Sequence, residues 1–140
     1  MADAKSPATE PAVRPLSPHI SIYRWPITMA MSIAHRVTGS ALYVGTLLLV
    51  WWLIAAASGQ TAYGWVQAAA SSWIGRLVLF GYTWALMHHM LGGIRHFIWD
   101  TGHGFGPTER NALAWATLYG SIVLTILIWL IAYFTTGALR

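Results

Sequence analysis

Long runs of apolar residues, separated by short polar stretches, dominate the pattern along this chain. The charge-free run over 37–57 is about 21 residues long, and 77–99 and 112–136 form two further apolar segments of similar length. About 20 apolar residues in a helix can cross the hydrocarbon core of a bilayer. The pattern therefore predicts an all-α membrane protein with three transmembrane helices, over residues 27–57, 77–99 and 112–136.

Proline and glycine mark where these helices begin and end. Pro26 suits the first position of the first helix, because its fixed φ is already helical. After the second helix, Gly102 or Gly104 can supply the left-handed residue that helix ends favour. Residues 61–75 are predicted to form a loop that can include a short surface helix, and residues 101–111 a glycine-rich connection.

The segment before the first helix holds five of the six prolines. It has neither the basic start and apolar core of a secretory signal nor the arginine-rich pattern of a mitochondrial import sequence. Residues 14–26 are expected to be extended, because residues before proline avoid the helical region. We therefore divide the chain into a cytoplasmic or interfacial segment, 1–26, and a three-helix transmembrane domain, 27–140.

Composition supports a membrane protein. Hydrophobic residues make up 56 % of the chain and charged residues 9 %, whereas about a quarter of a soluble domain is charged. Nine tryptophans and six tyrosines suit the two membrane interfaces. There is no cysteine, so any iron–sulfur cluster must belong to a partner, and a haem would be bound non-covalently.

The cations indicate the orientation in the membrane. With three spans, the N-terminal segment and the loop 101–111 lie on the same side. Six of the eight basic residues lie on or near that side: Lys5, Arg14, Arg24, Arg36, Arg95 and Arg110. The positive-inside rule then places the N-terminus in the cytoplasm. The net charge of +4 is explained in this way and does not indicate nucleic-acid binding.

The end of the second predicted helix carries most of the candidate chemistry. It reads HHMLGGIRHFIWD and contains His88, His89, Gly92, Gly93, Arg95 and His96. On a helix, His89, the two glycines and His96 fall at i, i+3, i+4 and i+7 and share one face. Ionisable groups at membrane depth are costly and usually functional. A flat macrocycle could lie on the glycines, with its iron on His89 and its acidic edge towards Arg95. The alternative is that the glycines only let another helix approach closely.

Haem b in a helical bundle usually needs two axial imidazoles at one depth. His89 is about 10 Å deeper than His96 at 1.5 Å per residue. His35 is also expected near the cytoplasmic face, and the third helix has no histidine. The second ligand must then come from another polypeptide, which also completes the bundle. His88, about 100° round the helix from His89, is the alternative ligand.

A second candidate cluster lies at the start of the first helix. Ser32 and Arg36 are i, i+4 neighbours, with His35 beside them. A hydroxyl and a guanidinium could both donate to the carbonyl oxygen of a quinone whose tail lies in lipid. The alternative is that Arg36 is an interfacial anchor and Ser32 bonds its own helix.

The motifs RPLSPH (residues 14–19), YRWPIT (23–28), SIAHRVTG (32–39) and HMLGGIRH (89–96), followed by Asp100, resemble those of the cytochrome b anchor subunit of succinate dehydrogenase, complex II. The resemblance covers the N-terminal segment and the first two spans. It implies haem b with His89 as axial ligand, and His35, Arg95 and His96 near the haem propionates. It implies ubiquinone bound by Ser32 and Arg36, and three partners: a second small anchor, an iron–sulfur subunit and a flavoprotein subunit.

The resemblance predicts a bacterial cytoplasmic-membrane subunit that is not catalytic alone, with the mitochondrial inner membrane as the alternative location. Electrons from succinate would pass to ubiquinone. Three other functions are considered: the anchor of a quinol:fumarate reductase, a structural anchor without haem, and a small transport or channel subunit. The last needs a polar stripe along a whole span, and none is expected in the third helix.

Overall fold

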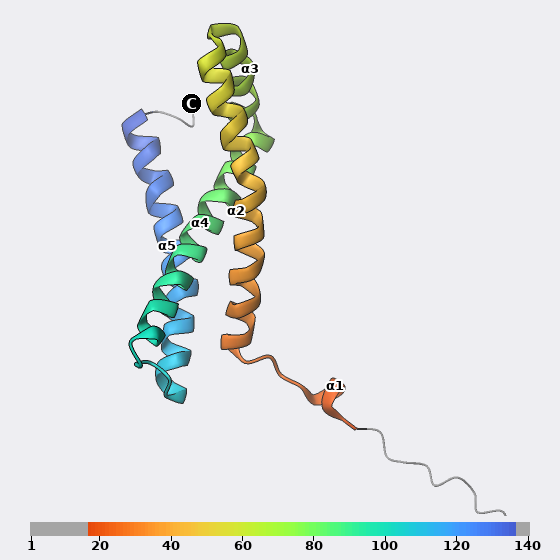
Figure 1. Ribbon diagram of the computed structural model, residues 1–140, viewed down its shortest axis with the longest axis vertical. Coiled ribbons are helices and arrows are strands. Elements are labelled where there is room, and N and C mark those ends of the chain that lie inside the picture. The colour runs from red at the N-terminus through yellow and green to blue at the C-terminus, as the bar shows by residue number, and fades with distance from the viewer. Residues whose placement is uncertain (1–16, 137–140) are drawn as a thin grey trace, which may run out of the picture.

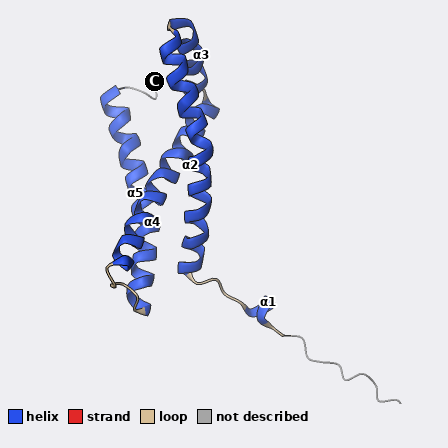
Figure 2. Ribbon diagram, viewed as in Figure 1, coloured by secondary structure: helices blue, strands red, loops and turns tan. Residues whose placement is uncertain are grey.

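The computed structural model describes residues 17–136, and every regular element in that range is a helix (Figures 1 and 2). The order is α1 (His19–Ile22), α2 (Ile27–Ser58), α3 (Gln60–Ser71), α4 (Trp73–Asp100) and α5 (Pro107–Thr136). Three of these, α2, α4 and α5, are long and apolar enough to cross a membrane. The prediction of an all-helical fold with three apolar spans is confirmed.

Helix α1 lies apart from the other helices (Figure 1). Tyr23 and Pro26 have extended backbone angles, as expected, but His19–Ile22 forms one short helical turn instead. Pro18 explains the turn, because its carbonyl accepts hydrogen bonds from the backbone N–H groups of Ser21 and Ile22, both at 3.0 Å. Arg14 lies outside the described residues.

Helix α2 ends at Ser58, and the next residue, Gly59, has a φ of +107°, which glycine adopts at little cost. The chain then forms α3, so the short helix allowed for in the loop 61–75 is present and spans twelve residues. A second sharp turn at Ser72 leads into α4. The Ser72 hydroxyl caps that helix by accepting the Gly75 N–H at 3.0 Å.

Two of the long helices begin earlier than expected. Helix α4 begins at Trp73 instead of residue 77, because Ser72 caps it there. Helix α5 begins at Pro107 instead of residue 112, with Pro107 at a position that favours proline and Glu109 in its first turn. Gly102 and Gly104, between the two helices, both have positive φ values, of 82° and 81°.

Helix α4 crosses between α2 and α5 and contacts both (Figure 1). Its buried side is a stripe at helical spacing: Ala85, His88, Gly92 and Arg95. The facing stripe of α5 is made of small residues: Ala114, Thr117, Ser121 and Thr125. Small side chains allow close approach of helices in membranes. Only 11–17 % of the most apolar stretch of each long helix is buried within the structure. Most of the apolar surface is therefore left for lipid or another polypeptide.

Candidate functional site

The imidazoles of His35 and His89 stack on each other where α2 crosses α4. Their ring centroids are 4.0 Å apart and the ring planes differ by 2°. The ring of His96 lies 5.4 Å from that of His35, tilted by 50°. Three of the histidines selected from the sequence therefore form one cluster, although His35 is more than 50 residues from the others.

A hydrogen bond fixes the tautomer of His89. Its Nδ1 lies 3.1 Å from the backbone carbonyl oxygen of His35. A carbonyl oxygen can only accept, so Nδ1 carries the proton and donates it. The lone pair of the neutral ring is then on Nε2, the nitrogen that can bind a metal. Metal-binding histidines commonly donate their other N–H to a backbone carbonyl in this way.

Two glycines make this close crossing possible, one on each helix. A Cβ atom added to Gly39 on α2 would lie 2.8 Å from Cε1 of His89. A Cβ atom added to Gly92 on α4 would clash with Nδ1 of His35 and lie 2.9 Å from its Cε1. Each glycine thus accommodates the histidine of the opposite helix.

The adjacent glycines of α4 therefore have different surroundings. Gly92 is buried and serves the approach of α2, as the packing alternative proposed. A Cβ atom at Gly93 would meet no described atom within 4 Å. Only Gly93 leaves open space beside His89, as expected for a surface on which a macrocycle could lie.

The expectation that His35 lies nearer the membrane surface than His89 is wrong, because the stacked rings are at one level. A second ligand from another polypeptide is nevertheless required, for a different physical reason. Two imidazoles that share one metal ion direct their nitrogen lone pairs at it along the ring planes, at about 2 Å each. Rings stacked face to face cannot do so. His35 is therefore no second ligand for an iron on His89, and α5 supplies no histidine.

His88 is in a different environment from its neighbour. It is 1 % exposed, between α4 and α5, and its Nδ1 lies 3.3 Å from the Ser121 hydroxyl. Its Nε2 is buried without a hydrogen-bond partner among the described residues. Because α5 covers this ring, His88 has no open side on which a haem could approach. His89 is only partly buried.

Helix α5 carries a short stripe of buried hydroxyls that covers only part of the span, 117–125, and not its whole length. Thr117, Ser121 and Thr125 recur every four residues of α5 and are 4 %, 0 % and 1 % exposed. Their hydroxyls donate to backbone carbonyls of α5 itself, at 2.7–2.8 Å. The stripe is buried, and Ser121 contacts His88 of α4, so these residues provide contact between the two helices.

Arg95 is 3 % exposed, and its guanidinium lies over the Trp99 ring, 5.1 Å from the centroid. Its Nε and Nη1 atoms are buried and have no hydrogen-bond partner among the described residues, and no ion pair to Asp100 forms. A buried cation in this state needs a negative partner. His35 Nδ1 is likewise buried and unpartnered. Arg95 and His35 thus have buried nitrogens without hydrogen-bond partners among the described residues, and carboxylates could bind there.

An apolar groove of about 440 Å³ runs along α2 and α4, lined by residues that follow His35 in α2 and precede His89 in α4. Its lining is mostly small and apolar: Ser40, Ala41, Val44, Gly45, Leu48, Val78, Gly81, Tyr82 and Ala85. Ala85 is one helical turn from His89, and Ser40 follows Gly39. A partly buried imidazole with a free Nε2, an adjoining apolar groove and a buried unpaired cation together fit a haem with its carboxylates.

Ser32 and Arg36 lie on α2, next to His35. Thr38 and Ser40 donate their hydroxyls to carbonyls of their own helix, but the Ser32 hydroxyl has no such partner among the described residues, so the alternative that it bonds its own helix does not hold. Ser32 is partly buried and Arg36 is exposed. Both groups remain available to a ligand.

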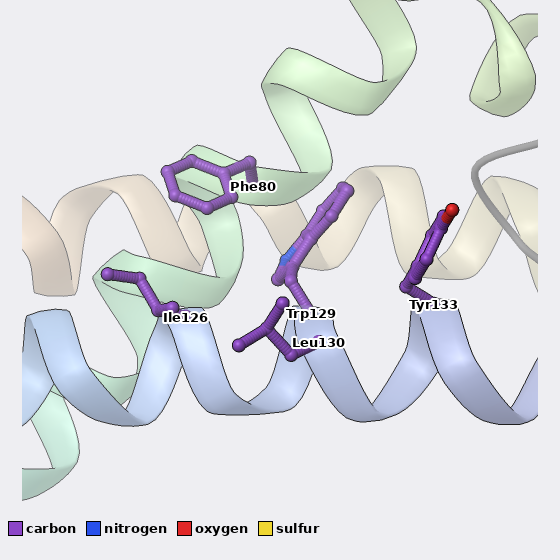
Figure 3. Close-up of a pocket in the computed structure, with 5 residues that line it drawn as sticks. All are labelled: Phe80, Ile126, Trp129, Leu130 and Tyr133. Carbon is purple, nitrogen blue, oxygen red and sulfur yellow. The ribbon is translucent and has the colours of Figure 1, made fainter.

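A second open groove, of about 340 Å³, lies at the other end of α4 and α5 (Figure 3). Phe80 from α4 faces Ile126, Trp129, Leu130 and Tyr133 from α5. Its sides are almost wholly apolar, and no histidine or cation lines it. It has none of the groups that chemistry would need, so we do not assign it to the site.

Sequence reasoning missed Gly39 and Ser121. Gly39 was part of a motif, but only its approach to His89 gives it a role. The sequence does contain a pattern that could have indicated this role. On each of the two helices, a glycine follows a histidine by about one helical turn: Gly39 after His35, and Gly92 after His89. Ser121 belongs to the hydroxyl stripe of α5, which the apolar composition of that span obscured.

The chain is similar in sequence to known membrane subunits. Residues 11–128 match the family described as succinate dehydrogenase/fumarate reductase transmembrane subunit. The succinate dehydrogenase cytochrome b556 subunit of Paracoccus denitrificans is 40 % identical over 114 residues, which cover 81 % of this chain and 88 % of that protein. The subunit of the same name from Rickettsia prowazekii is 41 % identical over 117 residues, 83 % and 90 % of the two chains.

A mitochondrial protein is also similar. The succinate dehydrogenase cytochrome b560 subunit of Sus scrofa is 44 % identical over 95 residues, which cover 65 % of this chain and 55 % of that protein. Both bacterial and mitochondrial relatives therefore exist. Together with the three long apolar helices, the matches identify a multi-pass membrane protein.

Proposed function

Because the chain belongs to the succinate dehydrogenase/fumarate reductase transmembrane-subunit family, we propose that it is the haem b-binding membrane anchor of a succinate:quinone oxidoreductase. A second small anchor completes the bundle, and iron–sulfur and flavoprotein subunits supply electrons from succinate. The observation that carries the proposal is the His89 imidazole: its Nδ1–H donates to the His35 carbonyl, and its Nε2 is left as the possible ligand atom, one helical turn from the groove residue Ala85.

In this proposal His89 is the axial ligand contributed by this chain, and the second ligand comes from the other anchor. Arg95, His35 and His96 form the environment of the haem propionates. The buried unpaired nitrogens of Arg95 and His35 support this assignment, because they require acceptors that the described residues do not provide. When bound, haem b supplies a one-electron carrier within the membrane.

Ser32 and Arg36 are proposed to bind the ubiquinone head group. A hydroxyl and a guanidinium that both donate to a quinone oxygen stabilise the negative charge that develops there on reduction. The exposed Arg36 and the unpartnered Ser32 hydroxyl support this role. Their position at the start of α2, on the side rich in cations, supports a quinone site near the cytoplasmic face, where soluble subunits would dock.

The proposed location is the bacterial cytoplasmic membrane, with the N-terminus in the cytoplasm. The cation distribution supports this orientation. The Paracoccus and Rickettsia relatives support a bacterial membrane, with the mitochondrial inner membrane as the alternative. The family description also includes fumarate reductases. The ratio of succinate oxidation to fumarate reduction, measured with different quinones, distinguishes the two directions.

The quinone role is tested with Arg36→Ala in the whole complex. Quinone reduction should fall at least tenfold, because a charge-assisted contact contributes about 1.5–3 kcal/mol. Succinate oxidation by an artificial acceptor should stay close to that of the wild type, since the acceptor takes electrons before the quinone. Equal loss of both activities would contradict a quinone role and indicate failed assembly.

A further inference from the structure

We propose that Gly39 and the backbone carbonyl of His35 position the His89 imidazole, so that one turn of α2 sets the redox potential of the haem iron on His89. Gly39 is then a positioning residue that acts through His89. The inference rests on the proposed function of His89 as axial ligand. The juxtaposition that carries it is the α2–α4 crossing, where both groups contact the same ring.

The His35 carbonyl oxygen accepts more than one side-chain donor. It accepts Nδ1–H of His89 at 3.1 Å and lies 3.0 Å from the Thr38 hydroxyl. The Thr38 hydroxyl is shared with the Ala34 carbonyl, at 2.8 Å. In the helical pattern, the same oxygen also accepts the backbone N–H four residues later. A carbonyl oxygen has two lone pairs, and the hydrogen bond within the helix uses one of them. Thr38 and His89 therefore compete for the other.

Gly39 determines how closely the ring can approach this carbonyl. A Cβ atom there would lie 2.8 Å from Cε1 and 3.3 Å from Nδ1 of His89. A side chain at this position would push the imidazole away from α2 and lengthen its hydrogen bond. This part of α2 cannot move with the His89 ring, because the His35 imidazole is packed closely against Gly92 of α4.

The hydrogen bond affects the electronic properties of the ligand. Donation from Nδ1–H to a carbonyl raises the basicity of the imidazole, and a more basic axial ligand favours the ferric state. Hydrogen bonding around the ligands is one of the means by which proteins set a haem potential. Weakening the bond from His89 should therefore raise the midpoint potential, and strengthening it should lower the potential.

The test is a redox titration of the haem, with electron paramagnetic resonance of the oxidised form, on the whole complex carrying Gly39→Ala. The ferrous-to-ferric ratio at a given potential should rise by up to about tenfold, which is about 59 mV for a one-electron couple. Thr38→Val, which removes the competing hydroxyl and keeps the side-chain shape, should shift the ratio in the opposite direction.

Two alanine variants are matched controls. In Gly120→Ala the added Cβ would lie 2.9 Å from Leu91, so α4 and α5 are crowded to a similar degree without contact to His89. In Gly64→Ala the added Cβ meets no described atom within 4 Å. Both should keep the wild-type potential and resonance spectrum, because neither contacts the ring.

Wild-type potentials in both Gly39→Ala and Thr38→Val would overturn the inference, and so would an equal shift in Gly120→Ala. If Gly39→Ala alone loses its haem, the positioning role is supported and the sign of the Thr38→Val shift tests the effect on potential. Absence of haem from the wild-type complex would instead refute the proposed function from which the inference starts.

Discussion

Gly92 and Gly93 of α4 should respond in opposite ways to the same substitution. A Cβ atom at Gly92 clashes with Nδ1 of His35 and lies 2.9 Å and 3.1 Å from two carbon atoms of that ring. A Cβ atom at Gly93 meets no described atom within 4 Å. The His35 ring has little room to move, because it stacks on His89 at 4.0 Å.

The expected magnitude follows from two contributions to the free energy of unfolding. Replacing glycine by alanine inside a helix stabilises it by about 0.5–1 kcal/mol, and this gain applies at both positions. Overpacking costs about 1–3 kcal/mol, and this cost applies at Gly92 alone. The two variants should therefore differ by about 1–3 kcal/mol, with Gly93→Ala at least as stable as the wild type.

The assay is titration of the purified chain in mild detergent with sodium dodecyl sulfate, followed by near-ultraviolet circular dichroism of its tryptophans. Gly92→Ala should lose its packed state at a lower dodecyl sulfate fraction than the wild type, and Gly93→Ala should not. In the whole complex, Gly93→Ala should nevertheless lower the haem content, because it fills the open surface beside His89. Equal destabilisation by both substitutions would refute the distinction between the two glycines.

Two further predictions concern contacts between α4 and α5, measured by the same titration. Ser121→Val removes the only hydrogen-bond partner that His88 has among the described residues, and it should lower the free energy of unfolding by about 1–3 kcal/mol. Thr125→Val should lower it by less, since that hydroxyl bonds only its own helix. Equal effects would contradict a role for the Ser121–His88 contact. Thr83→Val removes the acceptor that the Trp129 indole N–H reaches at 3.3 Å and should cost about 0.6 kcal/mol, the average for interhelical hydrogen bonds in membranes, and an unchanged titration midpoint would show that this contact contributes no stability.

The three spans could be predicted because lipid requires uninterrupted apolar helices, and that requirement is visible in the sequence. The first residues of α4 and α5 were harder to predict from the sequence. The charged residues Glu109 and Arg110 made the first turn of α5 resemble a loop, although Pro107 and Glu109 suit a helix start. Local capping thus extended both helices beyond their apolar cores.

The sequence predicted which residues belong to the candidate site but not how they are arranged in space. The sequence identified His35, His89 and His96, but their stacking depends on how α2 crosses α4, and no periodicity within one helix contains that information. The sequence favoured His89 over His88 because His89 shares a face with the two glycines and His96, but it did not show how deeply each ring is buried. That distinction comes from α5, which buries His88 with Ser121 and leaves His89 partly open.

The measurement that tests the central proposal most directly is a reduced-minus-oxidised visible spectrum of the purified complex, comparing wild type with His89→Ala and His88→Ala. Assembly is checked in each by succinate oxidation with an artificial acceptor. A b-type haem band should be present in the wild type and in His88→Ala, and lost or altered in His89→Ala. A band that survives unchanged in His89→Ala, or that is absent from the intact wild-type complex, would contradict the assignment of His89 as the haem ligand.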